Sequence, residues 1–546
     1  MEIQYYLNNA LPKLSWIATA NRAEGIIYVE HGVFVECRKD WMVEGVWDGD
    51  FEKGEFHQSE NFFGSGIRAE QDVIYFVPSS ALVDRLLYCE YKKKIIVSNS
   101  LILLMAYTGA TLDGNHDYWK ESLSILKGVN YYEKEFKIIH PQIECFYQVF
   151  NENMVVSKKG IKFEKRSKAQ HNIGTFEQYF ELLKNILFRI KNNYEDEGRN
   201  TSFSSFTTIS KGYDSTAVSS LAKDLGVRIC FTGSGPLKGS LHWLRFIYNR
   251  LRRYYHSDDG TSAAKALGLE VKYLNRERST VSQDELYFLS TNYPKFAPMQ
   301  EKSLAVNGYQ LNPIHHWPEL SLHTMTSYLE KSCSVAVVFT GYHGDKVWET
   351  DLDKKYLADD IIRGDLSGLN ITEIRLKSGF INLPVPFILA LNIRDIFKIS
   401  HSKEMEPWRL RNNYDRPIPR RIAESSGVNR YDFGIEKLFL ANAYNLPVNR
   451  QLRKSFFVFL RRKHGITRMF VYIYFCGNQM IRIFQKILYK IKLSDSLISS
   501  YRVYFWKEFD FYFFMNHWAI HNLSEKTANI FKNKLRRFDN SLLTKE

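Results

Sequence analysis

The chain has 546 residues, which is more than one ordinary domain contains, so we expect two or three domains. Hydrophobic residues make up 45% of it and charged residues 25%, which is typical of globular proteins and excludes wholesale disorder. Lysine and arginine number 74 against 60 aspartates and glutamates, so the formal net charge is +14. This excess favours polyanionic partners such as nucleic acids, acidic lipids or nucleotide phosphates, without selecting one of them.

The six cysteines lie far apart, with no Cys-x-x-Cys pair and no cluster at the spacing of metal ligands. This distribution favours free thiols in a reducing compartment. The first residues carry an acid at Glu2 and lack the apolar run of a signal peptide. The most hydrophobic tract, 469–475, is too short to span a bilayer. We therefore expect a cytoplasmic protein.

The order of patterns along the chain predicts an α/β protein in three parts. Residues 1–170 contain short apolar or alternating runs separated by Gly, Asp and Asn, which predicts an antiparallel β-rich domain. Within 171–440, an amphipathic helix with Thr175 as its N-cap precedes apolar strands that alternate with helices. That alternation is typical of a parallel sheet with helices on both faces. Residues 441–546 are basic, rich in aromatic side chains and helical in pattern.

Residues 210–216, with the sequence Ser-Lys-Gly-Tyr-Asp-Ser-Thr, lie between an apolar strand and a helix. A helix N-terminus offers unpaired N–H groups and partial positive charge, so it binds anions readily. Gly212 would let the backbone approach a phosphate, and the hydroxyl donors would be Ser210, Ser215 and Thr216. Asp214 beside a phosphate requires a cation between them, and Mg²⁺ prefers oxygen ligands. The alternative is a Ser-capped turn with a solvent-facing aspartate.

This loop resembles SGGxDS[ST], the pyrophosphate-binding loop of the PP-loop ATP pyrophosphatases and in particular of the asparagine synthetase family. Four positions match this motif, namely Ser210, Gly212, Asp214 and Ser215. Thr216 fits the final Ser/Thr, and Lys211 stands where the family usually has the first glycine. A lysine at this position could still contact phosphate.

Two later segments follow in the family's order. Residues 257–275 resemble the acidic loop, helix and strand that come after the nucleotide-binding strand, and residues 337–349 resemble the SGxGxDE loop. In the second loop, Thr340 and Gly341 stand for Ser-Gly, and Asp345 stands for the second metal-binding aspartate. The resemblance implies that Asp214 and Asp345 converge on one Mg²⁺–pyrophosphate at the carboxyl ends of parallel strands. His343 and Lys346 depart from the family's usual Gly and Glu.

Two catalytic candidates come from the same resemblance. Residues 372–387 are similar to the ExRxPFLD stretch, which implies that Glu373 is the glutamate that accepts the proton of an attacking amine. The alternative is a surface glutamate paired with Arg375 or Lys377. Residues 416–437 resemble a region that ends in the lysine offsetting charge in the adenylating transition state, which implies Lys437. An ordinary surface lysine is the alternative there.

The first 170 residues also match the family in outline, because residues 92–106 resemble its strand-plus-helix with a faSexxaLl-type sequence. In the family this domain is a glutaminase whose nucleophile is a cysteine directly after Met1. Here that position holds Glu2, and a carboxylate cannot act as this nucleophile. We expect a degenerate glutaminase-like domain without glutaminase activity.

The resemblance implies an ATP- and Mg²⁺-dependent ligase that adenylates a carboxylate, releases pyrophosphate, and forms an amide with ammonia or a substrate amine. Its partner would be a small-molecule or peptide carboxylate. Two alternatives stay open: a PP-loop enzyme that adenylates a tRNA base, although no RNA-binding module is recognisable, and a pseudoenzyme that binds nucleotide without turnover. For the C-terminal tract, a helical cap packed on the synthetase domain is favoured over peripheral contact with a membrane.

Overall fold

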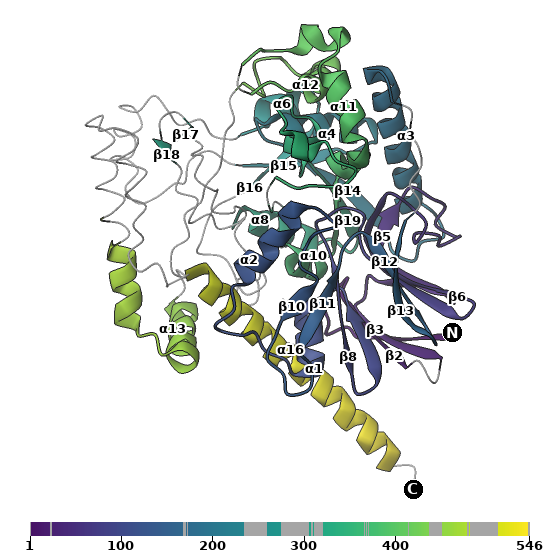
Figure 1. Cartoon of the computed structure of the whole chain (residues 1–546), viewed down its shortest axis with the longest axis vertical. Helices are drawn as coiled ribbons and strands as arrows, with labels where there is room; N and C mark the ends of the chain where they lie inside the picture. Colours follow the sequence, from purple (N-terminus) through teal and green to yellow (C-terminus); the bar gives the residue numbers. More distant parts are fainter. Residues whose placement is uncertain are drawn as a thin grey trace.

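The computed structural model describes residues 2–21, 25–166, 171, 173–233, 259–274, 305–306, 309–310, 320–364, 366, 368–369, 371–412, 414–435, 450–477, 480 and 511–543. It has an N-terminal part built of two β-sheets, then a five-stranded parallel sheet with helices, then helices toward the C-terminus (Figure 1). The α/β class and this order of parts agree with the sequence prediction. The boundaries near residues 170 and 440 stay a prediction.

The N-terminal part consists of two sheets, and every strand pair in them except β1 with β3 is antiparallel. A core that includes Trp16, Val29, Ile67 and Phe76 draws on strands of both sheets. In spatial order, the first sheet is β1 (Glu2–Leu7), β3 (Ile26–His31), β2 (Trp16–Asn21), β9 (Lys94–Ser98), β8 (Leu86–Tyr91), β11 (Cys145–Val149) and β10 (Glu135–Lys137). The second sheet is β13 (Gly160–Lys165), β12 (Glu152–Ser157), β7 (Val73–Val77), β6 (Phe62–Glu70), β5 (Trp41–Trp47) and β4 (Glu36–Cys37).

The third sheet is entirely parallel, in the order β16 (Glu270–Leu274), β15 (Ile229–Gly233), β14 (Phe203–Thr208), β19 (Val335–Thr340) and β20 (Phe380–Pro384). Successive side chains of β19 enter two different cores, since Val338 belongs to one and Val337 and Phe339 to the other. Both faces of the strand are therefore covered, which explains why its sequence is apolar throughout.

Helices surround these sheets. Thr175 caps α3 as predicted, because its side chain accepts a hydrogen bond from the backbone N–H of Gln178 at 3.3 Å. The α-helices are α1 (Leu101–Thr108), α2 (Tyr118–Leu123), α3 (Phe176–Tyr194), α4 (Tyr213–Asp224), α6 (Thr261–Ala266), α8 (Leu320–Glu330), α9 (Gly344–Val347), α10 (Thr372–Ser378), α11 (Ile393–Ser400), α12 (Pro417–Ser425), α13 (Arg450–His464) and α16 (Phe511–Leu543). The short elements are β17 (Ala305–Val306), β18 (Tyr309–Gln310), η1 (Ser124–Lys127), η2 (Lys354–Tyr356), η3 (Val385–Phe387), η4 (Ala390–Asn392) and η5 (Lys403–Trp408).

A buried ion-pair group joins the parallel-sheet region to the N-terminal sheets. Arg375 on α10 donates to both carboxylate oxygens of Glu44 on β5, at 2.7 and 3.0 Å, and to Asp84 at 3.2 Å. The side chain of Arg375 is 1% exposed and that of Glu44 is fully buried. Because buried charges are costly unless they are paired, these three residues fix how the two parts meet.

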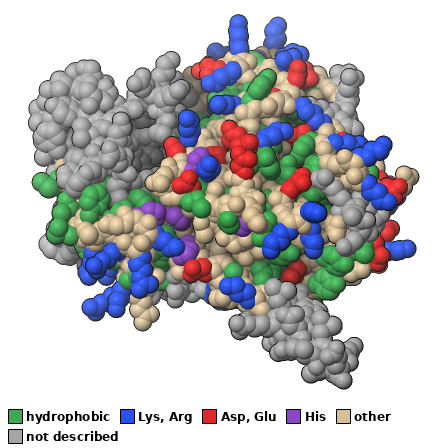
Figure 2. All heavy atoms as spheres, turned by 60° about the horizontal axis from the view of Figure 1, so that its bottom comes forward, with side chains coloured by type: hydrophobic (Ala, Val, Ile, Leu, Met, Phe, Trp, Pro, Cys, Tyr) green, Lys and Arg blue, Asp and Glu red, His purple; other side chains and the backbone are tan. Residues whose placement is uncertain are grey.

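The C-terminal helices pack against the N-terminal part as well as the parallel-sheet region. Helix α16 lies along α1 (Figure 1), and the rings of Trp518 and Phe456 meet with centroids 5.5 Å apart. We expected the C-terminal helices to pack on the parallel-sheet region. They do so only in part, because α1 of the N-terminal part supplies much of their docking surface. Figure 2 shows Lys and Arg side chains gathered at one corner of the molecule beside a group of histidines. The last four residues of helix α13, 461–464, are Arg-Arg-Lys-His and so combine these residue types.

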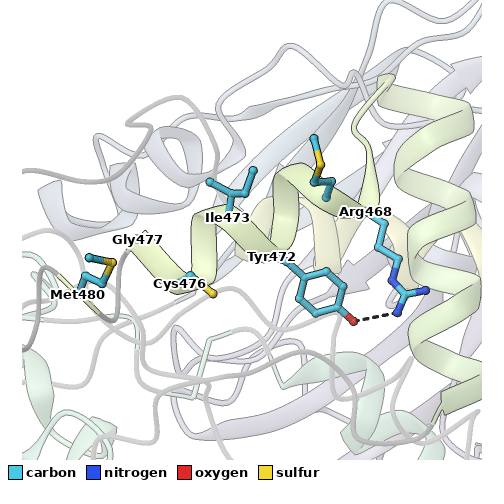
Figure 3. A pocket seen from close by; sticks show the side chains of 7 residues that line it. Arg468, Tyr472, Ile473, Cys476, Gly477 and Met480 are labelled. Atoms are coloured by element: carbon cyan, nitrogen blue, oxygen red, sulfur yellow. Dashed lines mark hydrogen bonds between the residues drawn. The ribbon is translucent and has the colours of Figure 1, made fainter.

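Residues 468–480 carry an apolar groove of about 700 Å³ next to α13. Figure 3 shows Ile473, Cys476 and Met480 along it, with Arg468 donating to the Tyr472 hydroxyl at 3.4 Å. Among the helices that the structure describes, none combines the length and the apolar character needed to cross a bilayer. Peripheral contact with a membrane through this tract stays a prediction.

The Arg375 ion pairs predict a large effect of Arg375→Ala on stability. Removing the guanidinium leaves Glu44 buried and unpaired, so we expect the free energy of unfolding to fall by about 3–5 kcal/mol in urea denaturation. Arg189→Ala, which removes a half-exposed pair with Asp48, is the control and should cost no more than about 1 kcal/mol. Equal losses for the two variants would contradict the role assigned to Arg375.

Candidate functional site

Two loops meet at the carboxyl edge of the parallel sheet. Strand β14 leads through residues 209–212 into α4, and its neighbour β19 leads through residues 341–343 into α9. Because both strands run in the same direction, their loops emerge at the same edge, which is where open α/β sheets bind ligands. These are the two loops that the sequence singled out.

The space around two glycines shows how closely these two loops approach each other. A Cβ atom on Gly341 would lie 2.8 Å from the backbone C of Asp214 and from the backbone N of Ser215. On Gly344 it would lie 2.6 Å from the Asp214 Oδ1. Only glycine fits at such distances, so the second loop rests directly on the start of α4. The structure thus brings Asp214 and the loop that carries Asp345 together, as the sequence led us to expect.

The hydroxyl groups of the first loop brace the turn itself. The Ser210 and Ser215 hydroxyls lie 2.8 Å apart, and the Gly212 N–H donates to Ser210 Oγ at 3.1 Å. The Thr216 hydroxyl donates to the carbonyls of Gly212 at 2.8 Å and Ser210 at 3.0 Å. These hydroxyls, which we expected to contact phosphate, have partners within the loop. Since the N-cap is Gly212, no side chain of the described residues caps the first turn of α4.

A buried arginine that sequence reasoning missed holds the carboxylate of Asp214. Arg416, the residue before α12, donates from Nη1 to the Asp214 oxygens at 2.8 and 2.9 Å and from Nη2 to Glu349 at 2.9 Å. Its side chain is 1% exposed. Burial alone would lower the pKa of Arg416, but the charges of Asp214, Glu349 and Asp345 outweigh burial and raise it. The guanidinium is therefore a permanent cation among these acids.

The carboxylate at which we expected magnesium is held by an arginine. Carboxylate oxygens suit Mg²⁺, but both oxygens of Asp214 already accept hydrogen bonds from Arg416. Within the described parts of the chain, no three His, Cys, Asp or Glu side chains form a group that could hold a metal ion. A fixed guanidinium thus stands where we expected the metal.

Residues 414–434 close over the first loop. Arg420 on α12 donates to the Tyr213 hydroxyl at 2.7 Å, and the Gly434 N–H donates to the Lys211 carbonyl at 2.7 Å. A Cβ atom on Gly434 would lie 2.3 Å from the Tyr213 ring, and its φ of 62° is one that glycine tolerates best. The start of α4 is therefore held from one side by β19 and from the other by this segment. Lys437 lies outside the described residues.

His343 explains one departure from the resembled motif. Its φ is 75°, a left-handed conformation that favours glycine, the residue found there in the family. The imidazole stacks on Phe387, with centroids 4.6 Å apart and planes at 18°. Burial lowers the pKa of His343 to about 3, so the ring is neutral at physiological pH. The stacking contact holds this residue in its unusual conformation.

Glu373 caps a helix of the N-terminal part. Its carboxylate accepts hydrogen bonds from the Ser100 hydroxyl at 2.7 Å and from the N–H groups of Leu101 at 2.8 Å and Ile102 at 3.4 Å. These groups form the start of α1, where a carboxylate stabilises the positive end of the helix. It is thus neither a surface glutamate nor paired with Arg375 or Lys377.

Near the end of β19, the polar side chain from β20 is Asn382. The Thr340 hydroxyl donates to Asn382 Oδ1 at 2.9 Å, so this expected phosphate ligand also has a protein partner. Asn382 is buried, and within the described parts of the chain its Nδ2 has no hydrogen-bond partner. The amide of Asn382 therefore cannot act as a general base at neutral pH, which a glutamate at this place could do.

Glu373→Gln tests the buried cap through its pH dependence. Burial raises the pKa of Glu373 from 4.5 to about 7, against hydrogen bonds from Ser100, Ile102 and Leu101 that lower it. Between these values the folded protein keeps a proton that the unfolded chain has released, so stability falls as pH rises. We expect wild type to lose stability relative to the variant between pH 4.5 and pH 7. The relative loss in unfolding free energy, measured in urea, should be on the order of 1–3 kcal/mol.

The exposed carboxyl of Glu181 provides the control, because Glu181→Gln should change the unfolding free energy by a similar amount at both pH values. Wild-type and Glu373→Gln curves that run parallel across this range would contradict a buried, proton-binding cap.

Neither a scan against models of known protein families nor a search of curated proteins finds a match to this chain. The geometry of the site therefore has to carry the functional conclusion by itself.

Proposed function

We propose that the chain binds the phosphates of a nucleotide such as ATP at the start of α4, on an asparagine synthetase-like plan with a degenerate glutaminase-like N-terminal part, and that it does so without adenylating a substrate. The observation that carries the proposal is the direct contact of the loop after β19 with the start of α4, whose first turn has no side-chain cap. Unpaired N–H groups at a helix N-terminus are donors that phosphate oxygens accept.

A third segment supports a ligand site at this edge. The Gly260 N–H donates to Thr232 Oγ1 at 2.9 Å, at the end of β15. A Cβ atom on Gly260 would lie 3.0 Å from the backbone N of Ser210, so this segment also approaches the first loop closely. The carboxyl ends of β14, β15 and β19 thus contribute to one surface, and Lys211 supplies a cation in the loop itself.

Two features of this chain favour binding without turnover. Arg416 holds both oxygens of Asp214, and the three hydrogen bonds of Glu373 go to the start of α1. Each feature assigns to structure a carboxylate that adenylation or amide formation would use.

The second candidate is the ligase itself. It would use ATP to activate the carboxylate of a small molecule or peptide, release pyrophosphate, and form an amide with ammonia or a substrate amine. The observation in its favour is that Asp214 and Asp345 lie on adjoining loops, both close enough to Arg416 to raise its pKa. The tRNA-modifying alternative has no observation of its own in the described residues.

Lys211→Ala tests the nucleotide site. We expect wild type to bind ATP in isothermal titration with EDTA present, and the variant to bind about tenfold or more weakly, because it loses a charged contact with phosphate. Lys223→Ala, at the opposite end of α4, is the matched control and should leave the affinity unchanged. Equal affinities for all three proteins would contradict the proposed site.

A pyrophosphate-release assay with ATP, magnesium and a panel of small carboxylates and peptides separates the two candidates. The proposal predicts binding without release. Release that depends on a carboxylate would establish the ligase and overturn the proposed absence of turnover.

A further inference from the structure

A second cavity, of about 880 Å³, lies between the N-terminal sheets and the parallel-sheet region. One wall comes from residues 129–130 and from the β12 and β13 strands, and the other from residues 359–361 and 387–392. The volume is in the range of sites that hold small molecules. Its lining includes no residue of the loops 209–216 and 340–345, so it is distinct from the proposed nucleotide site.

Arg166, at the end of β13, lines this cavity and is 9% exposed. Its Nε donates to Asn153 Oδ1 at 3.3 Å and its Nη2 donates to the Pro78 carbonyl, but its Nη1 has no hydrogen-bond partner among the residues that the structure describes. Burial lowers the pKa of Arg166 to about 9, and no nearby carboxylate raises it. A buried guanidinium without an acid partner is costly, so it calls for an anion that the protein does not supply.

The acids around the same cavity already have partners in the protein. Asp360 accepts hydrogen bonds from the N–H groups of Val129 at 3.1 Å and Asn130 at 3.2 Å, which also ties the two walls together. Glu152 pairs with Lys134 at 3.2 Å, and Asp359 with Arg394 at 3.6 Å. Lys165 in the lining donates to Asn130 Oδ1 at 2.8 Å, so the cavity offers Arg166 as a buried cation without an acid partner, beside acids that each contact another group of the protein.

We propose that this cavity binds a small molecule or a peptide end that carries a carboxylate, with the guanidinium of Arg166 as the donor to that carboxylate. A guanidinium matches the planar geometry of a carboxylate. Asp360, whose partners are backbone N–H groups, keeps its negative charge in the wall and would repel a phosphate more strongly than a singly charged carboxylate, so a carboxylate fits the cavity better. The inference does not depend on nucleotide binding, because the two sites share no residue.

The cavity nevertheless touches the nucleotide site through one contact. Phe387, in its wall, stacks on His343 of the loop after β19. A ligand seated against Phe387 would thus lie one side chain away from the proposed phosphate site, in a position suited to a substrate or an effector of that site.

The first test uses stability without ligand. Removing an uncompensated buried charge is neutral or stabilising, so we expect the urea midpoint of Arg166→Met to equal or exceed that of wild type. Arg199→Met is the matched control: Arg199 is another buried arginine, paired with Glu36 at 3.0 Å, and its loss should lower the midpoint clearly. An Arg166→Met midpoint as low as that of Arg199→Met would overturn the proposal, because Arg166 would then be a satisfied structural residue.

The second test uses glycylglycine, glycylglycinamide and inorganic phosphate as probes, with affinities measured by saturation-transfer NMR on the full chain. We expect glycylglycine to bind at least about tenfold more tightly than its amide, and Arg166→Met to abolish that preference. Equal binding of acid and amide, binding that survives Arg166→Met, tighter binding of phosphate, or no binding of glycylglycine would each overturn the proposal. We expect the ATP affinity of Arg166→Met to equal that of wild type. The proposals for this site and for the nucleotide site can therefore be contradicted independently.

Discussion

The structure of the candidate site depends on one buried cation, the guanidinium of Arg416, which lies between Asp214 and Glu349. Two carboxylates at the carboxyl edge of a parallel sheet repel each other unless a positive charge lies between them, and here the chain supplies that charge itself. Because the side chain is buried, removing it would leave uncompensated acids and cost about 3–5 kcal/mol. The segment 414–434, which carries Arg416, thus joins the two acids and the two closely packed loops in one arrangement.

A second constraint is the contact between the N-terminal sheets and α10. Arg375 pairs with Glu44 and Asp84, and Glu373, two residues earlier, caps α1. One short helix therefore uses an acid and a base two residues apart to fix both α1 and β5. Because Glu373 has this structural role, its position in a sequence that resembles a motif is weak evidence for a catalytic role. The cavity lined by Arg166 lies at the same junction of the two parts.

Much of the fold could be predicted from hydrophobic patterns. The apolar runs of β14, β15 and β19 and the helices after them predicted the parallel sheet, and Thr175 predicted the start of α3. The approach of the two loops followed from the common direction of their strands. The partners of individual charges could not be predicted, because Arg416 lies 202 residues from Asp214 in sequence and Glu373 lies 273 residues from Ser100. Buried arginines carry no hydropathy signal, so Arg166 and Arg416 were missed.

The most direct measurement is the dependence of ATP affinity on magnesium in wild type and in Arg416→Ala, by isothermal titration with EDTA or with Mg²⁺. If the guanidinium replaces the metal, wild-type affinity is the same in both conditions, whereas the variant, with Asp214 and Glu349 uncompensated, binds only with Mg²⁺. Arg409→Ala, which removes a pair with Asp415, should behave as wild type does. Wild-type binding that requires Mg²⁺ would contradict the account.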